Sequence, residues 1–275
     1  MTKISASDVA KLRKATGAGM MDCKNALVES EGDFDKAIEI IRKKGKAIAN
    51  KRADRDATEG VVLAKVTEDK KHGALIVLNC ETDFVAKNEK FIEFAYKILE
   101  TALLNKPSSL EELKQQTIDN ISIDDRIKEE TGIIGEKIDL SFYSALDAEM
   151  LTAYIHPGNK IASLIGLNMV VDDQIGKDIA MQVTAMNPVS ISEKDVPEEI
   201  KQKELEIGKE QARQEGKPEE LLDKIALGKL NKFYKESTLL NQQFIKDQKI
   251  SVNQYLKQFN KELTVTGFIR YALEN

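Results

Sequence analysis

The sequence predicts an α+β fold in three parts, and three observations support this prediction. Apolar residues recur at helical spacing between glycines in residues 1–45, which favours a three-helix bundle. Two β-rich stretches, each followed by a helical pattern, contain the matching segments 74–79 (ALIVLN) and 163–168 (SLIGLN), which indicate a duplicated unit of β-hairpin and helix. After Pro197 the chain becomes strongly charged and helical, as is typical of a protruding antiparallel helical hairpin.

The N-terminal bundle, residues 1–45, is predicted to hold three short helices. Ser7 is placed to cap the first helix, which Gly17 would end. Asp33 is placed to cap the third, which Gly45 would end. The apolar positions that mark the three helices are Val9, Leu12, Met20, Cys23, Ala26, Leu27, Phe34, Ala37, Ile38 and Ile41.

A basic helical linker is predicted at residues 46–59. Residues 43–58 are rich in lysine, arginine and alanine and contain almost no large apolar side chain. Asp54 and Asp56 interrupt the positive charge and no aromatic residue lies between the basic ones, so an exposed charged face is favoured over a nucleic-acid patch.

Two core subdomains follow from the duplicated pattern. The first is predicted at residues 60–140, with strands at 60–67 and 73–79 around a turn at His72-Gly73, and helices at 89–103 and 110–131. The second is predicted at residues 141–194 and 235–275, with strands at 143–155, 161–168 and 263–271 and helices at 175–185 and 252–259.

The helical hairpin is predicted as an insertion at residues 195–234. Its first helix would run to about Gln214, break at residues 215–218, and continue as a second helix to Tyr234. An apolar seam between the two helices is predicted from Ile200, Leu205, Ile207, Leu221, Leu222, Ile225 and Leu230.

Composition narrows the function classes. The 275 residues carry 46 acidic against 41 basic side chains, a formal net charge of −5, which gives no overall electrostatic attraction to nucleic acid or an anionic membrane. No apolar run approaches the roughly 20 residues of a membrane span. Cys23 and Cys80 are far apart, and the first residues do not form a basic stretch before an apolar one. These features predict a cytoplasmic protein.

No pattern typical of an active site appears in the sequence. His72 and His156 lie in separate turns, and neither has Cys, Asp or Glu at the spacing of metal ligands. The segment 17–19 lacks the remainder of a phosphate-binding loop and is better interpreted as a turn between helices. The chain is therefore predicted to be a binding protein without a cofactor, a metal or catalysis of its own.

The most informative segment is 82–88 (TDFVAKN), between a predicted strand and a predicted helix. Either Thr82 or Asp83 caps the helix while Phe84 packs inward, or Phe84 projects and wedges into another protein, with Asp83 beside it. The first of the two matched units takes longer to reach its helix than the second, and residues 82–86 are the extra length. An extension present in one copy alone favours a functional interpretation.

Segment 82–88 and segment 12–24 (LRKATGAGMMDCK) closely resemble the two signatures of the bacterial elongation factor Ts family, and weaker similarity continues at 186–188, 216–218 and 266–270. The resemblance implies a UBA-like N-terminal bundle and a guanine nucleotide exchange factor for elongation factor Tu in translation. The implied partner is elongation factor Tu in its GDP-bound and nucleotide-free states, with a homodimer in a 2:2 complex as one possible assembly. Neither nucleic acid nor a membrane is expected as a partner.

The resemblance also implies roles for particular residues. Thr82, Asp83, Phe84 and Val85 would disturb the Mg²⁺ and phosphate site of the partner, with Phe84 inserted near the metal. The remaining residues expected to bind the partner are Leu12, Met20, Met21 and His156, although the turn 157–159 after His156 departs from the common family pattern. Contacts of the further C-terminal helix in longer members are not carried over.

Two other functions remain as alternatives. A ribosome-bound or RNA-binding protein without exchange activity would place residues 43–55 on phosphate groups. A hydrolase would use acids such as Asp83 and Asp124.

Overall fold

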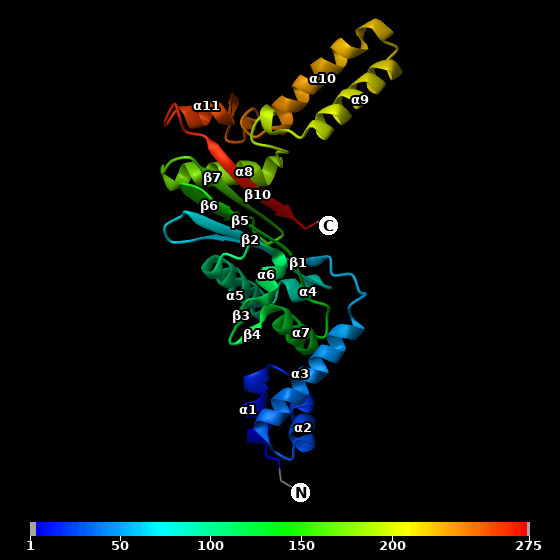
Figure 1. The fold of residues 1–275 in the computed structure, drawn as a ribbon, viewed down its shortest axis with the longest axis vertical. Coiled ribbons are helices and arrows are strands. Elements are labelled where there is room, and N and C mark those ends of the chain that lie inside the picture. Colours follow the sequence, from blue (N-terminus) through cyan, green and yellow to red (C-terminus); the bar gives the residue numbers. More distant parts are fainter. Residues whose placement is uncertain (1–3, 274–275) are drawn as a thin grey trace.

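The computed structural model describes residues 4–273 and shows an elongated molecule (Figure 1). A helical bundle lies at the N-terminal end, two β-sheets with their helices form the middle, and a helical hairpin projects at the opposite end. Helices and strands are both abundant, and the strands of each main sheet pair antiparallel. The predicted α+β class is confirmed.

The N-terminal bundle consists of α1 (Ala6–Thr16), α2 (Met20–Glu29) and α3 (Phe34–Lys51). The prediction of Ser7 as the first cap is wrong, because the Ser5 hydroxyl accepts a hydrogen bond from the Asp8 amide at 3.2 Å and caps α1 two residues earlier. Gly17 ends α1 as predicted, in the left-handed conformation at φ 73°. Asp33 caps α3 as predicted, by accepting a hydrogen bond from the Lys36 amide at 3.1 Å.

The prediction that α3 ends at Gly45 is wrong. The helix continues to Lys51, so Gly45 lies inside it and is buried. Gly45 faces Gly132 of a core helix, and a Cβ atom built on Gly132 would lie 2.3 Å from the Gly45 Cα atom. The glycine therefore serves a close helix crossing instead of a helix end.

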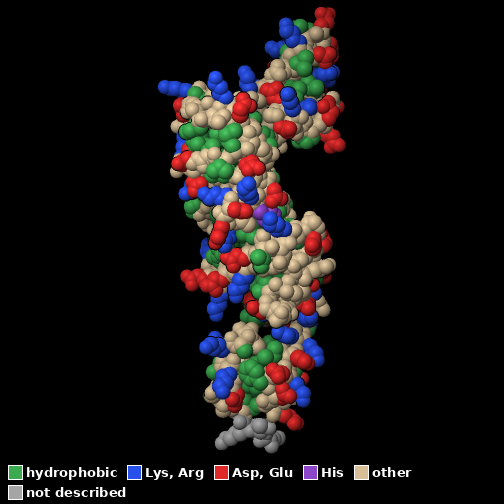
Figure 2. Space-filling model, turned by 60° about the vertical axis from the view of Figure 1, so that its left-hand side comes forward, with side chains coloured by type: hydrophobic (Ala, Val, Ile, Leu, Met, Phe, Trp, Pro, Cys, Tyr) green, Lys and Arg blue, Asp and Glu red, His purple; other side chains and the backbone are tan. Residues whose placement is uncertain are grey.

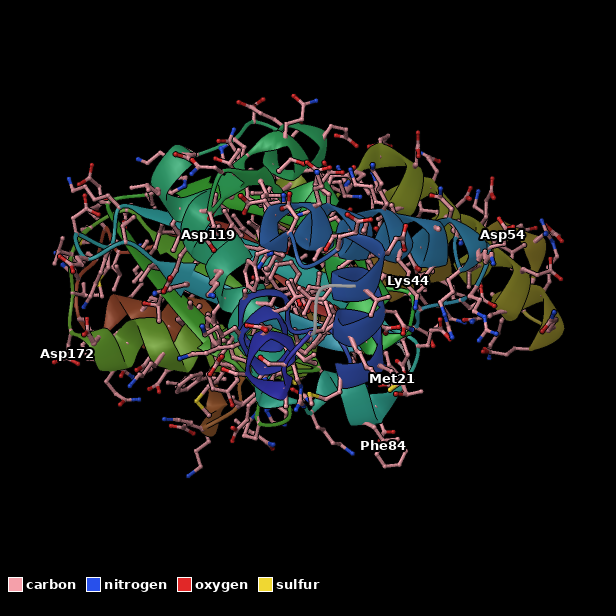
Figure 3. The ribbon with its side chains drawn as sticks, turned by 90° about the horizontal axis from the view of Figure 1, so that it is seen from below. Met21, Lys44, Asp54, Phe84, Asp119 and Asp172 are labelled. Carbon is pink, nitrogen blue, oxygen red and sulfur yellow. The ribbon has the colours of Figure 1, made fainter. Side chains whose placement is uncertain are left out.

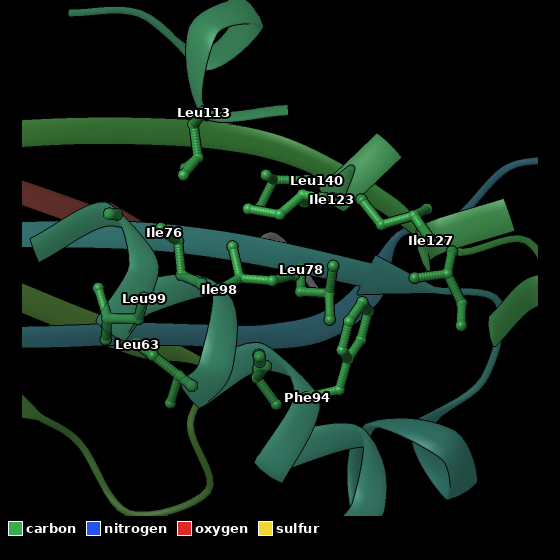
Figure 4. Close-up of a cluster of buried hydrophobic side chains, with 14 of the residues drawn as sticks. Leu63, Ile76, Leu78, Phe94, Ile98, Leu99, Leu113, Ile123, Ile127 and Leu140 are labelled. Carbon is green, nitrogen blue, oxygen red and sulfur yellow. The ribbon is translucent and has the colours of Figure 1, made fainter. Parts of the chain in front are cut away.

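The first sheet has the strand order β1-β2-β5, with both pairs antiparallel: β1 (Glu59–Val66), β2 (His72–Cys80) and β5 (Asp139–Asp147). His72 lies in β2 and not in the turn where it was predicted. Two further helices, α4 (Asp83–Ala86) and α5 (Glu89–Asn105), follow β2 directly. Figure 4 shows the buried cluster between this sheet and its helices; among its largest side chains are Leu63, Ile76, Leu78, Phe94, Ile98, Leu99, Leu113, Ile123, Ile127 and Leu140.

The predicted single helix over residues 110–131 is wrong. The segment divides into α6 (Leu110–Gln115), a small hairpin of β3 (Thr117–Ile118) and β4 (Ile121–Ser122), and α7 (Ile123–Ile134). Asp119 and Asn120 have positive φ angles of 52° and 62°, which a helix cannot accommodate. Ser122 then caps α7, where its hydroxyl accepts a hydrogen bond from the Asp125 amide.

The second sheet has the order β10-β7-β6, also antiparallel: β6 (Met150–Ile155), β7 (Ile161–Leu167) and β10 (Val265–Ala272). The expected strand over residues 143–155 is wrong, because its first part belongs to β5 and pairs with β2 of the other sheet. The remaining elements near this sheet are α8 (Asp173–Met186), the 3₁₀ turn η1 (Glu193–Asp195), β8 (Gln243–Phe244), β9 (Asp247–Ser251) and α11 (Val252–Lys257).

The two sheets share one apolar cluster. Residues of β1 and β2 pack there against Ala162 of β7 and against side chains of β6 and β10. The Phe142 and Tyr271 rings, one from each sheet, lie 4.8 Å apart between their centroids. The sheets are thus fixed to each other, and the elements at their edges keep constant relative positions.

The helical hairpin consists of α9 (Glu198–Gln214) and α10 (Leu222–Ser237), joined through the 3₁₀ turn η2 (Glu219–Leu221). Its predicted seam is partly wrong: Leu222 and Leu230 are buried, but Ile207 and Leu221 are exposed. The helices approach closely at Gly208, where an added Cβ atom would lie 3.1 Å from the Ala226 Cα atom. Small residues therefore form part of the seam together with Leu222 and Leu230, and Ile207 and Leu221 lie outside it.

Candidate functional site

The short helix α4 presents Phe84 to solvent. The Thr82 hydroxyl accepts a hydrogen bond from the Val85 amide at 3.4 Å and caps the helix. Ala86 is buried and Val85 is half-buried against the first core, so the inner face of α4 is anchored. Phe84 lies on the outer face with 83% of its surface exposed. Of the two interpretations of this segment, Thr82 is indeed a cap, but Phe84 does not pack inward.

Glu136 fixes the start of α4 from a distant part of the chain. Its carboxylate accepts hydrogen bonds from the Thr82 amide at 3.0 Å and from the Thr82 hydroxyl at 2.8 Å. Both oxygens of the carboxylate are engaged by one residue, so the backbone before Phe84 is held in one orientation. No sequence pattern points to Glu136, because 54 residues separate it from Thr82 and no local pattern connects them.

Glu81 connects α4 to the segment that follows the bundle. Its carboxylate accepts hydrogen bonds from Arg52 at 2.8 Å, from Arg55 at 3.0 Å and from the Lys137 amide at 2.6 Å. Desolvation alone would raise the pKa of Glu81, but these three donors outweigh it and lower the pKa to about 2. Glu81 therefore joins the start of α4 to the segment after the bundle through charged contacts, to which no local sequence pattern points.

Asp83 is engaged within its own helix. The Lys87 ammonium donates a hydrogen bond to the Asp83 carboxylate at 2.6 Å, and this contact lowers the pKa of Asp83. Both side chains reach solvent, so the ion pair is easily exchanged for another partner. Asp83 is thus an ionised acceptor placed directly beside the exposed Phe84 ring.

The N-terminal bundle exposes apolar side chains along α2. Met20 is 48% exposed and Met21 is 64% exposed. The expectation that Leu12 adds to this contact surface is wrong, since Leu12 is fully buried in the bundle core. Val28, which is 58% exposed, lies two helical turns from Met21 on the same face. The seven-residue spacing between them is the signal that could have identified it.

Met21 and Phe84 project from the same side of the molecule. Figure 3 looks along the long axis and shows both side chains at one edge of the outline, whereas Asp172 lies at a different edge. Figure 1 places α2 in the bundle and α4 beside the first sheet, so the two side chains lie at different heights along this side. A single partner that lies along the molecule could contact both.

The turn that carries His156 lies against the first sheet, near the start of α4. The Val62 amide donates a hydrogen bond to the Asn159 carbonyl at 2.7 Å, and Lys160 forms an ion pair with Glu59, which pairs with Cys80 at the end of β2. His156 is exposed, and its Nδ1 atom lies 3.3 Å from the Tyr154 hydroxyl. The exposed histidine thus occupies the same part of the fold as α4.

Charge is mixed along the molecule. Figure 2 shows acidic and basic side chains interspersed over the face in view, with no extended field of one sign. The basic residues at 43–55 are partly used in ion pairs: Lys44 pairs with Asp22, and Lys46 lies 2.9 Å from Asp125. Asp124, an acid of the hydrolase alternative, is engaged by Lys128 at 2.6 Å.

Within residues 4–273, no group of three or more His, Cys, Asp or Glu side chains is arranged to hold a metal ion. Over the same residues, no helix has the length and apolarity needed to cross a membrane.

Comparisons with known proteins assign the chain to one family. The family model for elongation factor Ts matches residues 81–275, and so begins at Glu81, directly before α4. An elongation factor Ts of Christiangramia forsetii is 52% identical over 99% of this chain and 100% of its own length. Proteins with the same name from Porphyromonas gingivalis and Flavobacterium psychrophilum are 50% and 46% identical, over 98% and 99% of this chain and 98% and 100% of their own lengths.

Proposed function

Because this chain belongs to the elongation factor Ts family, it is a guanine nucleotide exchange factor for elongation factor Tu in translation, and we propose that α4 carries the step that releases GDP. The observation that supports this step best is the exposed Phe84 ring on a helix fixed at its base. In this proposal Phe84 inserts into the partner near its Mg²⁺ and phosphate site and displaces the elements that hold the ion.

Thermodynamic linkage states what such an insertion must achieve. The exchange factor and GDP each weaken the binding of the other, so the factor must bind nucleotide-free elongation factor Tu more tightly than the GDP form. Mg²⁺ is a suitable point of attack, because the ion demands near-ideal octahedral geometry and depends on hydrogen bonds that hold its ligands in place. A displacement of the surrounding elements removes that geometry and with it the hold on the phosphates.

The four residues of the proposed release site have different roles. Phe84 is the wedge, and Asp83 offers an ionised acceptor beside the same network. Thr82 orients the helix through its cap and its two hydrogen bonds to Glu136. Val85 packs against the first core and keeps the outer face of α4 turned toward the partner.

Docking is proposed to involve two further surfaces. Met20 and Met21 on α2 form an adaptable apolar contact with the nucleotide-binding domain of the partner. His156 forms a third contact from the turn beside α4. The RNA-binding alternative is less well supported, since the basic residues that it requires are partly paired with acids of the chain.

The magnesium dependence of the Asp83→Ala variant tests this mechanism. We expect catalytic amounts of the variant to release fluorescent GDP from elongation factor Tu more slowly than the unmutated chain when magnesium is abundant. A chelator should largely remove this difference, because the ion that Asp83 helps to displace is then absent. A deficit that persists undiminished with the chelator would contradict the metal-displacement step.

Asp173→Ala provides the matched control. Asp173 is the first residue of α8, as Asp83 is of α4, and it pairs with Lys70 at 2.5 Å. Asp173→Ala removes an exposed aspartate–lysine ion pair, as Asp83→Ala does, but this pair does not contact α4. We therefore expect the Asp173→Ala chain to exchange nucleotide as the unmutated chain does, with or without magnesium.

A further inference from the structure

The bundle is joined to the core chiefly through one helix crossing. The second half of α3 packs along α7 (Figure 1). At the crossing Gly45 and Gly132 face each other, and a Cβ atom on Gly132 would lie 2.3 Å from the Gly45 Cα atom and 3.2 Å from its carbonyl carbon. Both glycines lie inside helices, where glycine is less favourable than alanine by about 1 kcal/mol. Close contact between the two backbones accounts for the glycine at 132.

A buried carboxylate holds the same crossing. Glu129 of α7 is 9% exposed. Its carboxylate forms ion pairs with two arginines, Arg42 of α3 at 2.9 Å and Arg126 of α7 at 2.9 Å. Each arginine engages a different carboxylate oxygen, so the contact resists rotation of one helix against the other. One helical turn farther on, Lys46 of α3 pairs with Asp125 of α7.

A second attachment lies beyond the end of α3. Lys137 donates hydrogen bonds to the Ala53 carbonyl at 2.7 Å and to the Arg55 carbonyl at 2.8 Å. Arg52 and Arg55 in turn bind Glu81, the residue before the cap of α4. The segment from Arg42 to Arg55 is therefore fixed to the core at both ends. Its C-terminal end binds Glu81, close to the start of α4, the helix that carries Phe84.

We propose that Gly132 is a positioning residue for exchange, because its contact with Gly45 sets the orientation of the bundle. In this orientation Met20 and Met21 meet the partner at the same time as Phe84. The inference rests on the docking role proposed above for the two methionines. Ordinary contacts begin at 3.4 Å, so a methyl group at 2.3 Å would force α3 and α7 apart by roughly 1 Å.

The two glycines provide a matched pair of variants. A Cβ atom on Gly45 would lie 3.6 Å from the Lys128 carbonyl oxygen and 3.7 Å from the Glu129 Cα atom, which are ordinary contacts. Gly45→Ala thus adds the same methyl group to the same crossing without a clash. Gly132→Ala must shift the bundle. This shift should weaken the docking of the chain on its partner.

The experiment measures GDP release from elongation factor Tu over a range of exchange-factor concentrations, with the full chain. For Gly132→Ala we expect about a tenfold rise in the half-saturating concentration, while the maximal rate stays unchanged because Phe84 is intact. Gly45→Ala should stay within about twofold of the unmutated chain. A distance distribution between spin labels at Asn25 and Glu93, which are both exposed, should shift or broaden with Gly132→Ala and not with Gly45→Ala.

A background in which Met20 and Met21 are replaced by alanine separates the two proposals. If the methionines dock and the crossing positions them, Gly132→Ala should cause no further loss in that background. The positioning role would be overturned if Gly132→Ala raised the half-saturating concentration equally with and without Met20 and Met21. It would also be overturned if the distance between the spin labels changed and the half-saturating concentration did not. If the methionine variants themselves exchange normally, the docking role fails and the positioning role fails with it.

Arg42→Met keeps the proposal testable if Gly132→Ala does not fold. Arg42 is partly exposed, and its loss removes one of the two arginines on Glu129 without placing any atom inside the crossing. We expect the half-saturating concentration to rise about threefold, again without a change in the maximal rate. Unchanged half-saturation in this variant would count against the positioning role.

Discussion

Two units of the molecule have the same order of elements but differ in the loop that follows the hairpin. The first unit passes from β2 to α5 through residues 81–88, which include α4, and the second passes from β7 to α8 through residues 168–172. Each loop exposes one apolar side chain, Phe84 at 83% and Val170 at 74%. Figure 3 places Asp172, at the end of the second loop, at a different edge of the molecule from Phe84.

The two loops differ in the parts of the molecule to which they are bound. Asn168 in the second loop donates a hydrogen bond to the Glu262 carbonyl and accepts one from the Thr264 amide, so that loop is fastened to its own subdomain. In the first loop, Glu81 binds Arg52 and Arg55 of the segment after the bundle, and Thr82 binds Glu136, two residues after the end of α7. The exposed ring of this loop therefore has a fixed relation to the bundle as well.

The largest expected effect contrasts two phenylalanines of the first unit. Phe91→Ala should lower the free energy of unfolding by about 3–5 kcal/mol, because Phe91 is almost fully buried in the first core. Phe84→Ala should change it by less than about 0.5 kcal/mol, as is usual for surface positions. Denaturant unfolding measures both, and a large loss for Phe84→Ala would show that the ring supports the fold.

Glu81 should make the stability of the first unit depend on pH. Its folded-state pKa of about 2 lies below the ordinary 4.5, so the carboxylate stabilises the fold above pH 4.5 and this contribution disappears as the pH falls toward 2. Glu81→Gln should therefore cost about 1.5–3 kcal/mol near neutral pH and much less at low pH. Urea unfolding of both chains across this range tests the prediction; a cost independent of pH would contradict it.

The hydrogen bonds that hold each loop in place offer a third contrast between the two units. Glu136→Ala removes two hydrogen bonds from Thr82 and should lower the maximal rate of GDP release about fivefold, equivalent to roughly 1 kcal/mol, because α4 loses its fixed start. Asn168→Ala removes two hydrogen bonds from the second loop and should leave the rate unchanged. Equal loss in both variants would mean that the two loops do not differ in the way proposed here.

The helical hairpin should have the smallest effect on exchange. Its tip, Gly216-Lys217-Pro218, lies far from α4 in Figure 1, and Gly216 adopts a φ angle of 72° that suits a turn. Replacement of the tip by another short turn should keep GDP release within about twofold of the unmutated rate. A large loss would show that the tip contacts the partner.

The sequence was sufficient for the features that depend on local patterns. The capped helix start at Asp33 and the helical hairpin after Pro197 could be predicted from neighbouring residues. At segment 82–88 the neighbouring residues left two interpretations open, with Thr82 or Asp83 as the cap and with Phe84 packed inward or projecting. The roles of Glu81 and Glu136 could not be predicted, because the residues that they bind lie in distant segments of the chain. Gly45 was misinterpreted as a helix end, since the same residue type also permits a close crossing and only the position of Gly132 distinguishes the two.

The most direct test of the account is the maximal rate of GDP release at saturating concentrations of the Phe84→Ala chain, with Val170→Ala as the matched loop variant. We predict that Phe84→Ala slows this rate by about tenfold or more, equivalent to about 1.4 kcal/mol, because the wedge is lost while docking persists. Val170→Ala should release GDP at the unmutated rate. A Phe84→Ala chain that reaches the unmutated maximal rate would contradict the claim that α4 carries the release step.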